Sequence, residues 1–352
     1  MERLRPMDDM SIYPTMEVVP VKRIMMVFAL TALVMGMASA AFALKVGLVT
    51  DTGGLNDRSF NQLAYQGLKQ AKSQLGTDIS VVQSKSQSDY VPNLTRFAQQ
   101  KYDMVVAVGF LMHDAVEQVS KNFPDTKFLL IDSEITDRPN VTSAMFAEQQ
   151  AGYLVGALAG MVEADSSVNL PGLRHNDTIG VVGGMSIPPV NRYIAGYYQG
   201  AKAEDPAINI LLGYTGNFND PASGKSLAQA QHSKGADIIF QVAGGTGIGV
   251  IQAAKDGGYY AIGVDTDQAY VAPDHVLTSA MKRVDVAVFQ TIKDLGNGTF
   301  TSGVHTFDLQ NNGVGMGAVL KSVPAAMQAK VKQIEADIKS GKIQVSDQIP
   351  QQ

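Results

Sequence analysis

The chain has 352 residues, of which 45% are hydrophobic and 17% charged, with 34 glycines, no cysteine and a formal net charge of −5. This mildly acidic balance provides no basic surface for nucleic acid or for electrostatic adhesion to an anionic membrane. Without cysteine the chain has no disulfide, no thiolate metal site and no lipid-modified cysteine of the lipoprotein type.

The first feature along the chain is an apolar leader. Residues 24–40 are uncharged and mostly apolar, and they follow Lys22 and Arg23. Ala41 and Ala43 are small residues at the two positions that a signal peptidase inspects, which predicts a leader over 1–43 that is cleaved after Ala43. The alternative is a membrane anchor, because the run approaches the ~18 residues that can cross a bilayer. The cleavage site favours export, so we expect a periplasmic protein.

Apolar runs of strand length then alternate with amphipathic segments. Roughly 300 residues remain after the leader, which exceeds what one hydrophobic core normally holds and predicts two domains. Strands without charge, each followed by a helix, are typical of parallel sheets covered on both faces, so the predicted fold class is α/β with two doubly wound parallel-sheet lobes. The strands are expected at 46–50, 79–83, 104–108, 127–131, 143–146, 178–182, 209–214, 238–242, 259–264 and 277–281. The helices are expected at 59–75, 90–100, 113–122, 148–162, 191–205, 223–234, 247–256 and 323–340.

The first strand opens into a glycine-containing loop over 51–62. Two glycines allow the backbone to approach a ligand closely, and Asp51, Asp57 and Asn61 supply directional hydrogen bonds. Phe60 stands at the mouth of the following helix. An ordinary strand-to-helix turn, with Ser59 or Asp57 as the N-cap, explains the same residues.

Polar residues also follow several later strands. Asp132 comes after 127–131, Asp265 after 259–264 and Lys282 after 277–281, while Gly244 and Gly245 open the segment after 238–242. The carboxyl ends of parallel strands meet at one crevice, where ligands of such folds bind. Carboxylates and amides gathered there suit a polyol such as ribose.

Six segments in order, 51–67, 146–156, 184–190, 196–202, 217–221 and 263–268, resemble the basic membrane protein family. The resemblance covers roughly 44–320. Members are substrate-binding proteins of ABC importers, and purine-nucleoside receptors are their best-understood representatives. The resemblance implies a class I periplasmic-binding-protein fold. We expect lobe boundaries at 44–146 plus 283–305 and at 147–282 plus 306–352, with hinge strands near 146–147, 281–282 and 302–306.

The resemblance also implies roles for individual residues. The base is expected to stack between Phe60 and Phe218, with its edge held by Asn61 and Asp57, Asp51 nearby and Asp132 reaching from the adjacent strand end. The ribose is expected at Asp265, at Lys282 and at the backbone of Gly244 or Gly245; Asp267, Asn217 and Glu148 are further candidates. Each residue has a simpler explanation, such as a core aromatic, a turn cap or a solvated charge.

The expected function is capture of a purine nucleoside by lobe closure, without catalysis, cofactor or metal. The expected partners are an ABC permease and ATPase, with the binding protein itself a monomer. Two alternatives stay open: the same fold binding a sugar, a free purine or an autoinducer, and a periplasmic nucleoside hydrolase. Residues 244–249 lack the three-glycine dinucleotide fingerprint, and the five histidines are scattered singly without metal-ligand spacing. Residues 164–177 form a longer insertion than the family pattern predicts, and Tyr193 stands where members often have Phe.

Overall fold

The structure is a computed structural model, and it describes residue 1 and residues 43–350. The predicted leader, 1–43, therefore lies outside the described residues except at its two ends. Among the described helices none combines the length and apolar character needed to cross a membrane.

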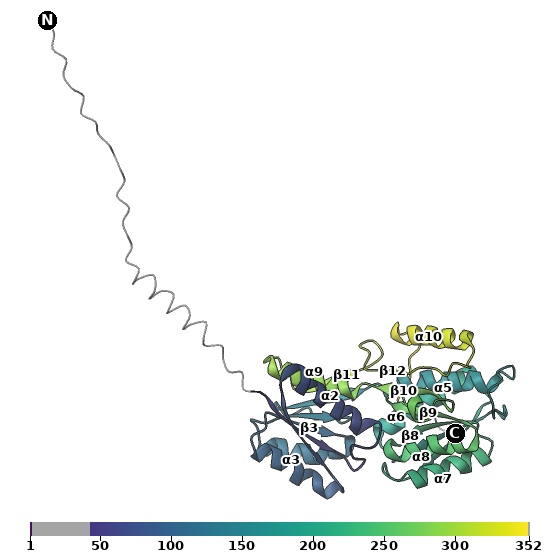
Figure 1. Cartoon of the computed structure of the whole chain (residues 1–352), viewed down its shortest axis with the longest axis horizontal. Helices are drawn as coiled ribbons and strands as arrows, with labels where there is room; N and C mark the ends of the chain where they lie inside the picture. Colours follow the sequence, from purple (N-terminus) through teal and green to yellow (C-terminus); the bar gives the residue numbers. More distant parts are fainter. Residues whose placement is uncertain (2–42, 351–352) are drawn as a thin grey trace. The chain divides into compact units, whose positions relative to one another are not determined.

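The first sheet has six strands, all parallel. Their spatial order is β11 (Gly303–Phe307), β5 (Val141–Phe146), β4 (Lys127–Ile131), β3 (Met104–Val108), β1 (Lys45–Thr50) and β2 (Asp78–Gln83). Helices α2 (Phe60–Leu75) and α9 (Val284–Gly296) cover one face, and α3 (Tyr90–Gln99) and α4 (His113–Asn122) cover the other (Figure 1). Side chains alternate between the two faces along each strand, as in β3, where Val106 packs toward α2 and Val105 toward α3 and α4. We call this sheet with its helices lobe I.

The second sheet has the order β12 (Val314–Met316), β10 (Val276–Lys282), β9 (Tyr260–Asp265), β8 (Ile238–Val242), β6 (Thr178–Gly183) and β7 (Asn209–Tyr214). Helices α5 (Glu148–Ala164) and α6 (Pro188–Glu204) lie on one face, and α7 (Pro221–Ser233) and α8 (Gly244–Gly257) on the other. The four shortest elements, all within residues 87–316, are β12 and the 3-10 turns η1 (Gln87–Asp89), η2 (Phe110–Met112) and η3 (Ala269–Val271). We call this sheet with its helices lobe II.

The predicted fold class is confirmed, with one correction. Strand β12 runs antiparallel to β10. The chain leaves β11 in the first sheet, passes through residues 308–313 and then runs along the edge of the second sheet in the direction opposite to β10. The sequence analysis also missed α9, β11 and β12. The sequence does contain the pattern of α9, because the apolar residues Val284, Val288 and Ile292 recur at helical spacing. All three are buried in the structure. Strand β12 spans only three residues, and the central residues of β11 are exposed, so neither shows an apolar strand pattern.

Three segments pass between the lobes. Two connect β5 to α5 and β10 to α9, near the expected hinge positions 146–147 and 281–282. The third lies at 308–313, beyond the expected 302–306, because β11 continues to Phe307 in the first sheet. The expected change of lobe after residue 305 is therefore two residues early.

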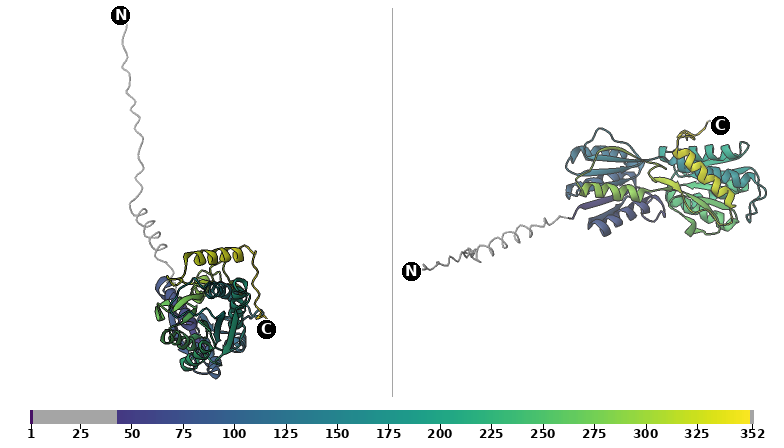
Figure 2. Two further views of the ribbon diagram at one scale, coloured as in Figure 1. Left: turned by 90° about the vertical axis from the view of Figure 1, so that its right-hand side faces the viewer. Right: turned by 90° about the horizontal axis from the view of Figure 1, so that it is seen from above.

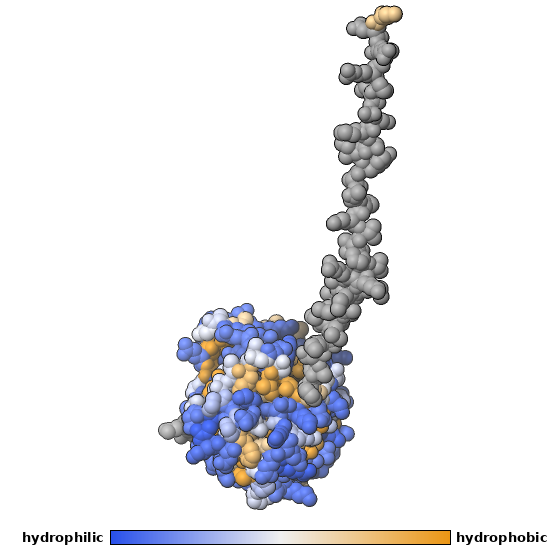
Figure 3. Space-filling view, turned by 90° about the vertical axis from the view of Figure 1, so that its left-hand side faces the viewer, coloured by the Kyte–Doolittle hydropathy of each residue, from blue (hydrophilic) through white to orange (hydrophobic). Residues whose placement is uncertain are grey.

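The C-terminal part packs on lobe II. Helix α10 (Ala325–Lys339) lies on the outside of that lobe and buries Met327, Val331, Ile334 and Ile338 (Figure 2). It contacts α5. Beyond it, Gln199 on α6 exchanges two hydrogen bonds with the backbone of Ser346. The segment after α10 is thus fixed to α6 at this point. Figure 3 shows a face of the molecule on which polar residues predominate, with smaller apolar areas between them.

Candidate ligand-binding site

A cleft lies where the carboxyl ends of the strands of both lobes meet. Nine of the ten residues predicted for the ligand site lie on its wall: Asp51, Asp57, Phe60, Asn61, Asp132, Phe218, Gly244, Asp265 and Lys282. Gly245 does not line the cleft, nor do the further candidates Asp267, Asn217 and Glu148. The remaining lining residues were not among the ten predicted for the ligand site, although Gly53 belongs to the predicted ligand loop; they are Gly53, Gly109, Phe110, Leu111, Ile187, Pro189, Val190, Tyr193, Val242, Ala243 and Val264.

The carboxylate of Asp57 accepts hydrogen bonds mainly from the backbone that surrounds it. Its Oδ1 accepts hydrogen bonds from the N–H groups of Ser59 (3.0 Å) and Gln62 (3.1 Å). Its Oδ2 accepts from the N–H of Asn61 (2.7 Å) and from the Asn61 amide (3.0 Å). Two of these bonds go to backbone N–H groups of the first turn of α2, so Asp57 caps that helix from two positions before the N-cap residue Ser59, close to the simpler explanation. Little of its hydrogen-bonding capacity remains for a ligand.

Asn61 and Asp51 form the next layer of the same loop. The Asn61 side chain accepts from the Asp51 N–H (3.2 Å) and donates to Asp51 Oδ1 (2.8 Å), which also accepts from Gly53 N–H (2.8 Å). Asp51 Oδ2 has no hydrogen-bond partner among the described residues and lies beside Gly109, where an added Cβ would come within 3.2 Å of it. Burial raises the pKa of Asp51 to about 6. This oxygen is therefore an acceptor left open to the cleft.

A buried charge network forms another part of the wall. Lys282 Nζ donates to Asp132 Oδ2 (2.6 Å) and to Glu148 Oε1 (2.9 Å), and Arg192 Nε donates to Glu148 Oε2 (2.6 Å). Burial alone would lower the pKa of Lys282, but Asp132, Glu148 and Asp265 raise it above its ordinary value, so the ammonium stays charged. Its Nζ also lies 5.0 Å from the centre of the Phe60 ring. Arg192 is a member of this network that was not predicted from the sequence.

Asp132 and Asp265 occupy similar positions in the two lobes, since Asp132 directly follows β4 and Asp265 is the last residue of β9. Both have left-handed backbone conformations, with φ of 70° and 63°, which are uncommon outside glycine. Asp265 Oδ2 accepts from Ser59 Oγ of lobe I, and Oδ1 accepts from the Tyr193 hydroxyl at 3.3 Å. Within the described part of the chain, the buried Oδ1 of Asp132 accepts no hydrogen bond. Burial raises the pKa of each carboxyl to about 6.

The two predicted stacking rings come from different lobes. Phe60 begins α2, while Phe218 lies in the loop between β7 and α7. Room for the Phe218 ring depends on Gly184, where an added Cβ would lie 2.3 Å from Cε1. Both rings are partly buried and line the cleft, so each offers aromatic surface to it. Their stacking on a base stays a prediction. Tyr193 also lines the cleft, so the presence of Tyr where family members often have Phe changes the wall of the cleft.

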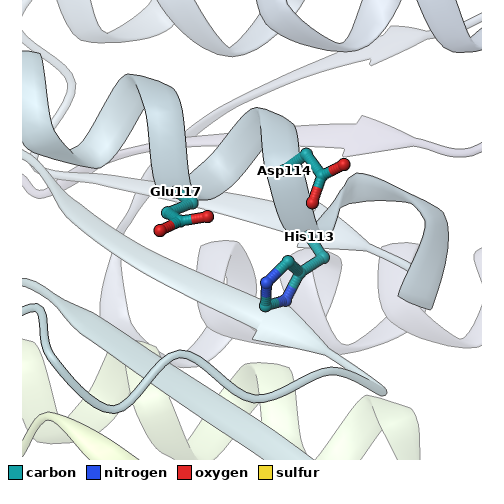
Figure 4. A group of neighbouring side chains, drawn as sticks. All are labelled: His113, Asp114 and Glu117. Atoms are coloured by element: carbon teal, nitrogen blue, oxygen red, sulfur yellow. The ribbon is translucent and has the colours of Figure 1, made fainter.

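One group of possible metal ligands lies outside the cleft. His113, Asp114 and Glu117 at the start of α4 place one ligand atom each within 4.8 Å of one another (Figure 4). No metal-ligand spacing was predicted for the histidines. His113 and Glu117 are nevertheless four residues apart in a predicted helix, and this spacing could have indicated the group from the sequence. His113 Nδ1 is hydrogen-bonded to Ser133 Oγ (2.9 Å), and Glu117 pairs with Arg138 at 3.8 Å. Both acidic residues are exposed, and no other feature of the described residues indicates a metal there.

Two α/β lobes that enclose a cleft at their strand ends define a binding protein of the periplasmic type. The family model for the ABC transporter substrate-binding proteins described as PnrA-like matches residues 44–349, and the chain belongs to this Bmp family.

Individual relatives agree with this assignment. The ABC transporter nucleoside-binding protein BmpA of Lactococcus lactis is 35% identical over 324 residues, 86% of this chain and 89% of the relative. An uncharacterized lipoprotein of Pyrococcus horikoshii is 39% identical over 285 residues, 78% of this chain and 68% of the relative. Among solved structures, an ABC transporter solute-binding protein of Aeropyrum pernix superposes with a TM-score of 0.78 at 28% identity, covering 88% and 94% of the two chains. The predicted family is confirmed. Substrate-binding proteins of this kind are extracytoplasmic and work with permease and ATPase components.

Proposed function

We propose that this chain is a monomeric periplasmic protein that captures a purine nucleoside and presents it to an ABC importer, without changing the ligand chemically. The cleft chemistry supports a nucleoside, and so does the similarity to a relative named as a nucleoside-binding protein. The predicted signal peptide supports the compartment.

The charge balance of the cleft wall carries the proposal. Among the described residues on the wall, Asp51, Asp57, Asp132 and Asp265 are acidic and Lys282 is the single cation. The cation is already paired, and the open polar atoms include the carboxylate oxygens Asp51 Oδ2 and Asp132 Oδ1. Such a wall selects a neutral ligand that donates several hydrogen bonds, and it repels phosphate. A nucleoside supplies base N–H and ribose O–H donors and carries no charge.

The positions of these groups suggest how the ligand lies. The base stacks between Phe60 and Phe218, which is worth on the order of 1–3 kcal/mol per base, and its N–H edge donates to Asp51 Oδ2. Asp132 is bonded to Lys282 in the charge network, so we assign it to the ribose hydroxyls together with Asp265 and Lys282. The backbone at Gly244 completes this part of the site.

Closure couples binding to transport. The three crossing segments allow the lobes to open as rigid bodies, and a ligand that contacts both lobes shifts the population toward the closed form. Water is expelled as the cleft closes, which strengthens the hydrogen bonds inside it. The closed form is then the one that the permease recognises.

The test is a thermal-shift and calorimetry series on residues 44–352 with inosine, guanosine, adenosine, free purine bases, ribose and the corresponding nucleoside monophosphates. A ligand at 100 times its Kd adds about 2.7 kcal/mol of apparent stability. We expect nucleosides to raise Tm and monophosphates not to. A response to ribose or to free bases alone would move the assignment to those ligands. Release of free base from a nucleoside in the same samples would show catalysis and contradict capture without chemistry.

A further inference from the structure

Two buried amide side chains connect lobe II to the ligand loop of lobe I without lining the cleft. Gln241 on β8 and Gln268 after β9 have no solvent exposure. Gln268 Nε2 donates to the backbone carbonyl of Arg58 at 3.1 Å, 210 residues away in the chain. Arg58 belongs to the loop that carries Asp51, Asp57 and Phe60, so this bond spans the two lobes next to the proposed ligand site.

The orientation of the Gln268 amide is determined by its other partners. Its Oε1 accepts from the Val264 backbone N–H at 3.0 Å and from Gln241 Nε2 at 2.6 Å. A backbone N–H can only donate, so the oxygen must face Val264 and the NH₂ group must face Arg58. The Gln268 N–H itself donates to Ser279 Oγ at 3.0 Å, and Gln241 Oε1 accepts from Ala243 N–H at 3.1 Å.

Both amide side chains are tightly packed, and two glycines provide the space that they occupy. An added Cβ at Gly247 would lie 1.7 Å from Gln241 Oε1, and one at Gly263 would lie 2.8 Å from Gln268 Oε1. Burying an amide is costly unless its groups are bonded, and here lobe II bonds the oxygens while a carbonyl of lobe I receives the remaining Gln268 donor. Opening of the lobes breaks the hydrogen bond between Gln268 Nε2 and the Arg58 carbonyl.

We propose that Gln268, held in place by Gln241, is a closure latch that sets the open-to-closed equilibrium and thereby the apparent affinity, without touching the ligand. This inference rests on the proposed function only for the identity of the ligand. Apparent affinity scales with the population of the binding-competent form, so weakening the latch weakens binding even when every ligand contact is intact. A second, exposed bond supports the same loop, since Asn219 Nδ2 donates to the Thr52 carbonyl at 3.2 Å.

The test variant is Gln268→Glu. In its ionised form it keeps the oxygen that accepts from Val264 and Gln241 but replaces the donor that faces Arg58 with a second acceptor, so the measurements are made at pH 8. The matched control is Gln66→Glu, which makes the same change at an exposed position on α2. The chain has no cysteine, so Gln118→Cys on α4 and Gln229→Cys on α7, both exposed, allow a distance between the lobes to be measured by spin labels.

We expect two inter-lobe distances in the wild type, with a closed fraction that rises when inosine is added. Gln268→Glu should lower that fraction and weaken inosine binding about tenfold, the effect of losing roughly one well-formed buried hydrogen bond. The Gln66→Glu control should match the wild type. Equal closed fractions and equal Kd in Gln268→Glu and wild type overturn the latch.

Two further results separate a failure of the latch from a failure of the nucleoside proposal and from misfolding. If inosine binds neither protein but the closed fraction is still lower in Gln268→Glu, the latch stands and the nucleoside proposal fails. If Gln268→Glu does not fold by circular dichroism, Gln268→Met decides, because it removes the same donor without placing a carboxylate in the buried site. A closed fraction in Gln268→Met below the wild type supports the latch, and an unchanged fraction overturns it.

Discussion

The two sides of the cleft are built in different ways. The side chains of Asp51, Asp57 and Asn61 bond to one another and to backbone groups at most ten positions apart, and the carboxylate of Asp57 caps a helix. The network of Lys282, Asp132 and Glu148 joins residues 150 and 134 positions apart and consists of full charges in a buried setting. The first can form as soon as α2 forms, whereas the second needs both lobes folded. Damage to the network should therefore affect the whole protein, and damage to the loop should remain local.

The largest expected effect is on the network. Lys282→Met leaves Asp132 and Glu148 buried without their cation, and removing one partner of a buried pair costs about 3–5 kcal/mol. Urea unfolding should show this loss. Lys121→Met, at an exposed position on α4, should leave stability unchanged. A loss below about 1 kcal/mol for Lys282→Met would mean that the pair is solvated and that the proposed contrast between the two sides is wrong.

The next effect is on binding alone. Phe60→Ala and Phe218→Ala should each weaken inosine binding by a factor of about 5 to 150, as the loss of one stacking face implies. Calorimetry measures the affinity, and circular dichroism checks the fold. Phe123→Ala removes a partly buried ring outside the cleft and serves as the control. Unchanged affinity in both cleft variants would refute the stacking assignment.

A smaller effect separates the two carboxylates of the loop. Asp57→Ala removes the cap of α2 and should lower the free energy of unfolding by about 1–2 kcal/mol. Asp51→Asn keeps the size of the side chain and the acceptor for Gly53 but loses the charged acceptor toward the ligand, so it should reduce affinity more than stability. Paired unfolding and binding measurements on the two variants check this division. The reverse ranking would make Asp57 the ligand contact and Asp51 the structural residue.

The smallest expected effect is a pH dependence of the ligand-free protein. Burial raises the pKa of Asp51, Asp132 and Asp265 from 3.8 to about 6, so between these values the folded state binds more protons than the unfolded state. Their contribution to stability is complete below pH 3.8 and is lost as pH rises through about 6. We expect a gain of at least about 1 kcal/mol between pH 7 and pH 5, because in this range each of these carboxyls binds a proton in the folded state and stays ionised in the unfolded state.

Chemical unfolding at the two pH values measures this gain, and Asp51→Asn should reduce it. Inosine affinity should change in the opposite direction and weaken toward pH 5, because a protonated carboxyl accepts hydrogen bonds poorly. Stability that is equal at pH 7 and pH 5 in the wild type and in Asp51→Asn would contradict the raised pKa values.

The sequence by itself determined the features that depend on near neighbours. Apolar runs of strand length and helical periodicity gave most elements of the fold, and polar residues directly after strands gave Asp132, Asp265 and Lys282 as candidates, because parallel strands end at a common edge. Six ordered segments gave the family. The tertiary structure alone decided that Lys282 pairs with Glu148 and that Gln268 reaches the carbonyl of Arg58. Those outcomes depend on which strand ends the folded sheets bring within 3 to 4 Å, and no local pattern specifies that.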